Sequence, residues 1–223
     1  MKIPSKEKIV KWLLQSYTMN DSELPGVCHC VNMGLAMEAV AKQCGLMDSE
    51  SAKAIGLLHD IGKIDPATNP YYDGNKRAHD IIGFDFLMKE GFPEIAYGAL
   101  THSLLSKDLN NEYNRAMFFD NETDLERLKS LLKNHIYSDT EKLLQLCDWI
   151  IQKDHVCTIE NSYEFIKKYY DYYDGLDDCL NEALKIKRYF DDACKKDIYE
   201  ICKNAIISKW DLTDFEKFIL SVI

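Results

Sequence analysis

The chain has 223 residues, of which 46% are hydrophobic and 29% charged, as is usual for a soluble globular protein that buries a sizeable core. Its formal net charge is −10, which argues against general binding to nucleic acid and against anionic membrane surfaces. An anionic substrate stays compatible with this charge, because a metal site brings its own positive charge.

The sequence contains eight cysteines, and we expect no export signal. Residues 1–20 carry charges throughout, and Lys11 interrupts their short apolar run, unlike the pattern of a signal peptide. No run of about 18 apolar residues occurs that could span a membrane. Cysteines such as Cys147 and Cys202 fall within apolar helical stripes. We therefore expect buried, reduced thiols in a cytoplasmic protein. A zinc knuckle at Cys28-His29-Cys30 is disfavoured, because no second Cys/His pair lies at finger-like spacing.

Helical periodicity dominates the first two thirds of the chain. Residues 4–17 form an amphipathic pattern, and an Ala- and Met-rich run over 27–43 ends near Gly45. Asp48 or Ser49 can cap a third helix, which we expect to carry His59 and to end at Gly62. Further helices are predicted over 76–89, from the break at 91–93 to about 105, and over 122–133, whereas 20–26, 65–74 and 107–121 are predicted to be irregular.

The rest of the chain is also predicted to be helical. Residues 138–141 form a capping-box pattern before a helix that continues to Lys153. Gly175 separates helices around 163–173 and 176–193, and one or two more follow, with a second capping box at 213–216. No alternating strand pattern is convincing. We predict an all-α fold, with a helical core over 1–155 and a helical extension over 156–223 that covers this core or forms a homodimer face.

One stretch organises the chain: Leu57-Leu58-His59-Asp60-Ile61-Gly62-Lys63, in which adjacent His and Asp follow an apolar run. Four other residues of suitable chemistry lie on predicted helices, and periodicity turns them inward. Asp148, for example, lies four residues after Leu144 and three before Ile151, near a buried face. A lone carboxylate there is costly unless it is paired or bound to a metal. The set is His29, His59, Asp60, His79, His102 and Asp148.

A single buried His is more often a hydrogen-bonded core residue than a ligand, and a single Asp at a helix border is usually solvated. Six such groups together are hard to attribute to coincidence, and neutral imidazoles and carboxylates suit Mn, Fe, Ni or Zn. His135 and His155 are weaker candidates. Asp80 belongs to a second His-Asp doublet, but the doublet at 59–60 has Lys63 after it and His29 upstream. We therefore predict that Asp80 is an exposed helix residue.

The order of these residues on helices resembles the HD-domain metal-dependent phosphohydrolase superfamily over roughly residues 20–155. The motif His-Asp-Ile-Gly-Lys at 59–63, with an upstream His and a downstream Asp, carries the resemblance. His79 and His102 add the two imidazoles of the dinuclear branch, which includes diadenosine-tetraphosphate hydrolases and cyclic-dinucleotide phosphodiesterases. The Gly-Tyr-Pro motif of the latter is absent, and the segment between His102 and Asp148 is long for the former. A broader resemblance is to bacterial HD hydrolases with helical C-terminal extensions.

The resemblance implies a divalent-metal enzyme with two ions per chain, Fe, Mn or Ni, with Mg or Zn as alternatives. His29, His59, Asp60 and Asp148 would hold one ion, and Asp60 would bridge to a second held by His79 and His102. A hydroxide generated there would attack the phosphorus of a nucleotide or related phosphate ester. Asp60 and Lys63 are the implied catalytic residues, Lys63 by stabilising phosphoryl charge or orienting Asp60.

Several flanking residues are candidates for substrate contact. Lys76 and Arg77 are the main ones, because they flank the expected mouth of the site. Two further basic residues and two tyrosines are weaker candidates, for phosphate contact and for base stacking respectively: Lys107, Arg115, Tyr71 and Tyr72.

Two other functions stay open at this point. Some HD-fold proteins with a similar ligand set are di-iron oxygenases that cleave C–C or C–P bonds with O₂. A non-catalytic ligand-sensing or scaffolding HD module is the third interpretation, and the complete ligand set argues against it. The leading hypothesis is a phosphohydrolase that acts on a small phosphorylated substrate, without a membrane or bulk nucleic acid as partner.

Overall fold

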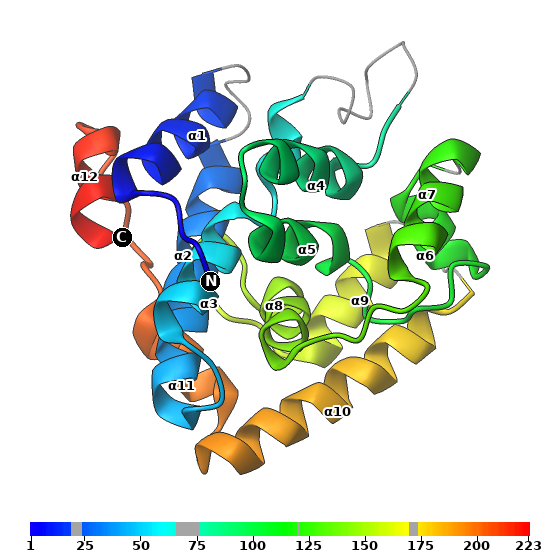
Figure 1. Cartoon of the computed structure of the whole chain (residues 1–223). Coiled ribbons are helices and arrows are strands. Elements are labelled where there is room, and N and C mark those ends of the chain that lie inside the picture. Colours follow the sequence, from blue (N-terminus) through cyan, green and yellow to red (C-terminus); the bar gives the residue numbers. More distant parts are fainter. Residues whose placement is uncertain (19–23, 66–75, 120, 170–173) are drawn as a thin grey trace.

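The computed structural model describes residues 1–18, 24–65, 76–119, 121–169 and 174–223, and these ranges form an all-α fold (Figure 1). The predicted fold class is therefore confirmed. No strand occurs in these ranges; one isolated antiparallel bridge joins Ile151 and Val156. The elements are α1 Lys6–Thr18, α2 Leu24–Cys44, α3 Ser49–Leu58, the 3-10 helix η2 Ile61–Ile64, α4 His79–Lys89, α5 Pro93–Thr101, α6 Glu112–Met117, α7 Glu122–Leu132, α8 Asp139–Ile150, α9 Ile159–Tyr169, α10 Leu176–Cys194, α11 Ile198–Ala205 and α12 Phe215–Val222.

Several helix ends follow from capping. Asp48 caps α3, because its carboxylate accepts the Ser51 N–H. Ser138 and Glu141 form the predicted capping box at the start of α8. The predicted second box at 213–216 is wrong: Asp214 is the cap of α12, and its carboxylate accepts the Lys217 N–H.

Other predicted boundaries need correction. α3 ends at Leu58 rather than Gly62, because a 3-10 turn follows it. α4 begins at His79 rather than at 76, since Ala78 has an extended backbone. α5 ends at Thr101, not near 105. α2 starts three residues earlier than expected, and the segment predicted to be irregular over 107–121 contains α6. As a result, three predicted ligands, His59, His79 and His102, lie at helix ends.

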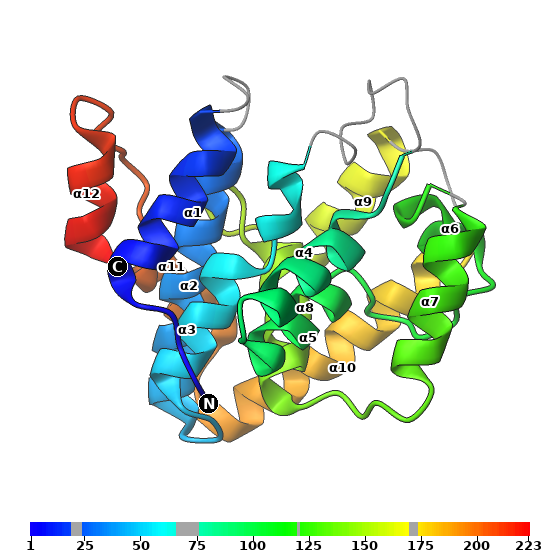
Figure 2. The same cartoon turned by 45° about the horizontal axis from the view of Figure 1, so that its top comes forward.

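α8, which carries Asp148, contacts α2, α3 and α5 and lies near the middle of the view in Figure 1. α2 and α3 approach closely through two glycines: a Cβ added to Gly56 would lie 2.9 Å from the backbone of Gly34. Figure 2 shows α4 and α5 packed on one another beside α3. Within the described ranges, no helix combines the length and apolar character that crossing a bilayer requires.

The C-terminal helices pack on the preceding ones. α11 contacts α2, α10 contacts α8, and α12 lies against α1 (Figure 1). Buried Asn32 on α2 joins the two parts, because its side chain accepts the Ile207 N–H at 2.7 Å and donates to the Ile207 carbonyl at 3.0 Å. The division into a core and an extension that covers it, with the boundary at 155, and a homodimer face stay predictions.

The close packing of η2 on α4 requires a glycine at position 62. A Cβ at this position would lie 1.9 Å from the His79 carbonyl oxygen and 2.7 Å from the Gly83 nitrogen. We expect Gly62→Ala to lower the free energy of unfolding by about 3 kcal/mol, the upper range for overpacking, because backbone atoms must move. Urea unfolding followed by circular dichroism measures this.

Gly45→Asn is the matched control. Gly45 has φ +67°, which Asn tolerates, and nothing lies within 4 Å of its added Cβ. We expect it to cost less than about 1 kcal/mol. Equal stabilities of the two variants would contradict the close approach at Gly62.

Candidate metal centre

His29 and His59 are brought together by the close contact of α2 and α3. Their ring centroids lie 5.2 Å apart, in an edge-to-face arrangement. His59 caps the C-terminus of α3 and is fully buried; its Nδ1 lies 2.7 Å from the carbonyl oxygen of Gly56, three residues earlier. A proton on Nδ1 satisfies that carbonyl and leaves Nε2 with a free lone pair. No hydrogen-bond partner is found for this buried Nε2 in the described part of the chain.

Asp60 follows at the start of η2, and its two carboxylate oxygens face different groups. Oδ2 lies 2.5 Å from Lys63 Nζ and 3.5 Å from His59 Nε2. Oδ1 lies 3.1 Å from His79 Nε2 and 3.4 Å from His102 Nε2. The tight turn through 60–64 reverses the chain direction, so that η2 packs on α4. This packing brings the Asp60 carboxylate close to His79.

His79 and His102 face one another from α4 and α5. Their Nε2 atoms are 3.0 Å apart. His102 caps the C-terminus of α5, and its Nδ1 lies 2.8 Å from the Ala99 carbonyl oxygen, as His59 does with Gly56. Two ring nitrogens at this distance repel one another unless a proton or a cation lies between them.

Asp148 closes the first group from α8. Its Oδ1 lies 3.0 Å from His29 Nε2 and 3.4 Å from His59 Nε2. One turn earlier, the buried Gln145 amide donates to the Thr101 carbonyl at 2.8 Å and to the Leu104 carbonyl at 3.0 Å. α8 therefore supplies one carboxylate and also fastens the turn that carries His102.

The donor atoms form two adjoining groups, His29-His59-Asp148 and Asp60-His79-His102, each with its ligand atoms within 4.8 Å of one another. Metal–nitrogen and metal–oxygen bonds of about 2.1 Å place neighbouring ligand atoms about 3.0 Å apart in an octahedron and about 3.4 Å apart in a tetrahedron. The distances above fall at these values. Together with the unpartnered Nε2 of His59, they show that the residues present fit a bound metal ion.

The two carboxylates are held in the charged form. Burial alone would raise the pKa of the Asp60 carboxyl, but Lys63 and His59 beside it hold that pKa well below its ordinary value. Burial alone would likewise raise the pKa of Asp148, but the neighbouring His29 and His59 hold that pKa well below its ordinary value. Burial opposes the charge on Lys63 too, but Asp60 raises the pKa of this ammonium. Anionic oxygens are therefore available to a cation.

The two buried imidazoles differ in protonation. Burial lowers the pKa of His59, so its ring is neutral at pH 7 and ready to act as a ligand. Burial opposes the charge on His102 as well, but the carboxylates of Asp80 and Asp60 raise its pKa to about 9. A metal ion that binds His102 must displace a proton, so its affinity at the second group falls as pH falls below 9.

Asp80 is the clearest correction to the sequence prediction. It was expected to be exposed, but it is fully buried behind the second group, and the Ser103 hydroxyl donates to its Oδ1. The helix pattern misplaced it because α4 begins only at His79, so the residue turns toward the end of α5 rather than to solvent. The sequence analysis also does not predict Cys30 at the site. Its Sγ atom lies in one group of possible ligand atoms with His59 and Asp60, and Cys28 is not part of that group.

The weaker histidine candidates lie elsewhere. His155 is exposed and lies 2.8 Å from the Asp154 carboxylate. His135 lies 2.7 Å from Glu141 and stacks on Tyr97. Neither shares a metal-binding group with other residues in the described ranges.

The basic residues predicted to contact substrate have partners within the chain. Arg77 lies 3.0 Å from the buried Asp124 carboxylate, and Lys76 lies over the Phe119 ring. Arg115 pairs with Glu122, and Lys107 donates to the His135 carbonyl at 3.1 Å. Their contact with substrate stays a prediction. Tyr71 and Tyr72 lie outside the described residues.

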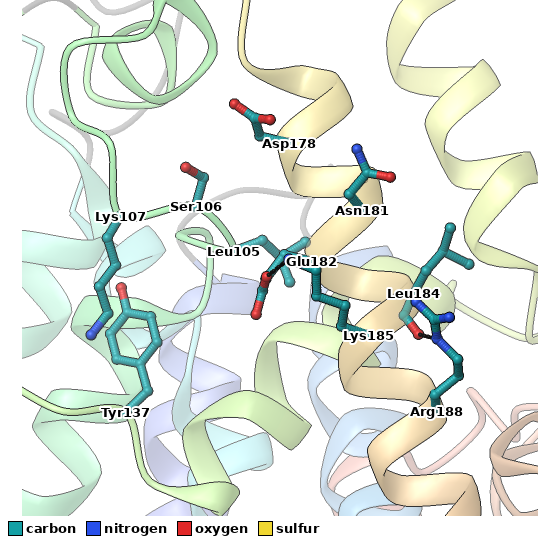
Figure 3. Close-up of a pocket in the computed structure, with 10 residues that line it drawn as sticks. All are labelled: Leu105, Ser106, Lys107, Tyr137, Asp178, Asn181, Glu182, Leu184, Lys185 and Arg188. Carbon is teal, nitrogen blue, oxygen red and sulfur yellow. Dashed lines mark hydrogen bonds and ion pairs between the residues drawn. The ribbon is translucent and has the colours of Figure 1, made fainter.

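A groove of about 700 Å³ lies away from the candidate centre, between α10 and the segment after α5. Figure 3 shows Lys107 and Tyr137 on one wall, with Asp178, Glu182 and Lys185 on α10 opposite. Lys107 stacks on Tyr137 at 3.8 Å, and Lys185 pairs with Glu182 at 3.0 Å. None of the six predicted ligands lines this groove.

A family model described as HD domain matches residues 26–151, more than half of the chain, and this range contains all six convergent residues. The chain therefore belongs to the HD domain family. Most members of this family are metal-dependent phosphohydrolases, and HD domains bind divalent metal ions. No curated protein and no solved structure matches the chain.

The centre predicts that metal ions stabilise the fold. An ion that binds only the folded state at 100 times its dissociation constant adds about 2.7 kcal/mol to the free energy of unfolding. We expect Mn²⁺ to produce a gain of this size for each site that it occupies. Asp148→Asn, which keeps the side-chain volume, should lose the contribution of the first group. Urea unfolding with and without Mn²⁺ measures it.

His155→Ala serves as the control, because this exposed residue lies apart from both groups, and it should keep the full Mn²⁺-dependent gain. An undiminished gain in Asp148→Asn would remove Asp148 from the set of ligands.

Proposed function

We propose that this protein is a dinuclear metal-dependent phosphohydrolase that acts on a nucleotide or a related phosphate ester. The observation that carries the proposal is the orientation of Asp60. One of its oxygens faces the group that contains His59, and the other faces His79 and His102. A carboxylate placed in this way can bridge two metal ions.

The residues have distinct roles in the proposed site. His29, His59 and Asp148 would hold one ion, His79 and His102 the other, and Asp60 would bind both. Fe, Mn or Ni suits this mixed nitrogen and oxygen set, with Mg or Zn as alternatives. When bound, such ions lower the pKa of coordinated water and neutralise phosphoryl charge. His59 presents Nε2 because Gly56 holds its other nitrogen, and His102 does so because Ala99 holds its own.

Lys63 supports the reaction through charge. Its ammonium group lies 2.5 Å from Asp60 Oδ2, and its side chain is 41% exposed, so it borders both the carboxylate and the solvent. It thus orients Asp60 and can donate to a phosphoryl oxygen that approaches from the open side. A small hollow of about 20 Å³ at this point is lined by Leu13, Val27 and Ile61, which leaves room for about one water molecule beside the ammonium group.

Phosphate release from a panel of nucleotides, cyclic dinucleotides and dinucleoside polyphosphates tests the function. We expect metal-dependent hydrolysis of at least one class, at the same rate with and without O₂. Asp60→Ala should lower this rate by about 10³-fold, since it removes the bridging group, while the helix content stays unchanged. Asp154→Asn, a change at an exposed carboxylate, should leave the rate unaltered.

Each alternative gives a different result. Turnover that requires O₂ and releases no phosphate would identify an oxygenase. Metal-ion binding without turnover of any substrate would favour a sensing module. Full activity of Asp60→Ala would overturn the proposed mechanism.

A further inference from the structure

His59, His79 and His102 surround Asp60 with their Nε2 atoms. They differ in the hydrogen-bond acceptor that is available to the other ring nitrogen, Nδ1. His59 and His102 cap the C-termini of helices, where the carbonyl three residues earlier accepts from Nδ1. His79 is the first residue of α4 and follows Ala78, which has an extended backbone. A residue at a helix N-terminus has no preceding turn of carbonyls to use. His79 therefore needs an acceptor of another kind.

Asp80 lies where that acceptor is needed. Its side chain is fully buried, and the Ser103 hydroxyl donates to its Oδ1. Its Oδ2 is also buried and has no hydrogen-bond partner in the described ranges. His79 Nδ1 lies 3.5 Å from this oxygen. Leaving a buried carboxylate oxygen without a donor is unfavourable, so a donor that comes within reach is strongly favoured.

We propose that Asp80 is a positioning residue for the second metal ion: its Oδ2 accepts a hydrogen bond from His79 Nδ1 and so presents Nε2 to the ion. This inference rests on the proposed dinuclear function. A ring movement of about half an ångström shortens 3.5 Å to the usual hydrogen-bond length. A carboxylate behind a metal-ligating His fixes the ring tautomer and raises its basicity as a ligand.

The same carboxylate affects the neighbouring ligand. His102 Nδ1 lies 3.6 Å from Asp80 Oδ1, so the two rings of the second group share one negative charge behind them. Asp60 lies on the opposite side of both rings, within 3.4 Å of each Nε2. Two carboxylates on either side of a pair of imidazoles favour a divalent cation over a single proton between the Nε2 atoms. The first group has no such carboxylate assigned to it, because Asp148 faces His29 and His59 directly.

A purely structural role for Asp80 makes a different prediction. Through Ser103, the carboxylate ties the start of α4 to the turn after α5. If this were its whole role, removing it would loosen both helices and weaken both metal sites together. A positioning role weakens the second site alone.

Titration of metal-free protein with Zn²⁺, followed by calorimetry, separates the two roles. We expect two binding events in the unaltered chain. In Asp80→Ala the event at the second group should lose 10- to 100-fold in affinity, the usual effect of removing such a partner, while the event at the first group stays unchanged. Asp80→Leu, which has the same branching but a larger side chain and no acceptor, should behave in the same way, so the test survives if the Ala variant does not fold.

The Zn²⁺-loaded protein offers a second readout that needs no activity. The Nδ1 proton of His79 should appear in ¹⁵N-resolved spectra as a low-field, slowly exchanging resonance, and the Asp80 variants should lose it. The Nδ1 proton of His102, held by the Ala99 carbonyl, is the internal control and should persist. A retained His79 resonance, equal weakening of both sites, or a single binding event in the unaltered chain would overturn the proposal. If the unaltered chain binds two Zn²⁺ ions but releases phosphate from no substrate, that result would instead count against the proposed substrate chemistry.

Discussion

The candidate metal centre depends on the buried carboxylate of Asp60. Removing a carboxylate from water is costly, and this one is 6% exposed. It is stabilised by a lysine on one oxygen and by imidazole nitrogens around both. The chain thus places buried charges where most folds place apolar side chains. Apolar side chains of similar volume would make the fold at least as stable, so these charges indicate a cation-binding role.

The helix ends give this charge its geometry. His59 and His102 take the same position, the C-cap of a helix, and the same bond, from Nδ1 to the carbonyl three residues earlier. The repeated device directs both Nε2 atoms toward Asp60. Gly62 lets η2 approach α4 closely enough for His79 to join them. The geometry of the candidate centre therefore depends on where helices end, more than on the interiors of the helices.

This dependence explains what the sequence could and could not predict. The all-α class, the capping box at Ser138 and the inward direction of Asp148 follow from periodicity over long helices, which is a strong signal. The set of six convergent residues followed from their chemistry and from the HD resemblance. Asp80 was misplaced because its burial depends on the exact start of α4, and helix boundaries are the weakest element of pattern analysis. Cys30 and Gln145 were missed because only tertiary packing brings them to the site.

The number of metal ions per chain tests the central claim most directly. Elemental analysis of protein purified without a metal-affinity tag should find two ions of Fe, Mn or Ni per chain. His79→Ala should reduce this to one, since it removes a ligand from one group and leaves His29, His59 and Asp148 intact. A single ion that is unaffected by His79→Ala would contradict the account, because His79 and His102 would then be core residues beside a mononuclear site.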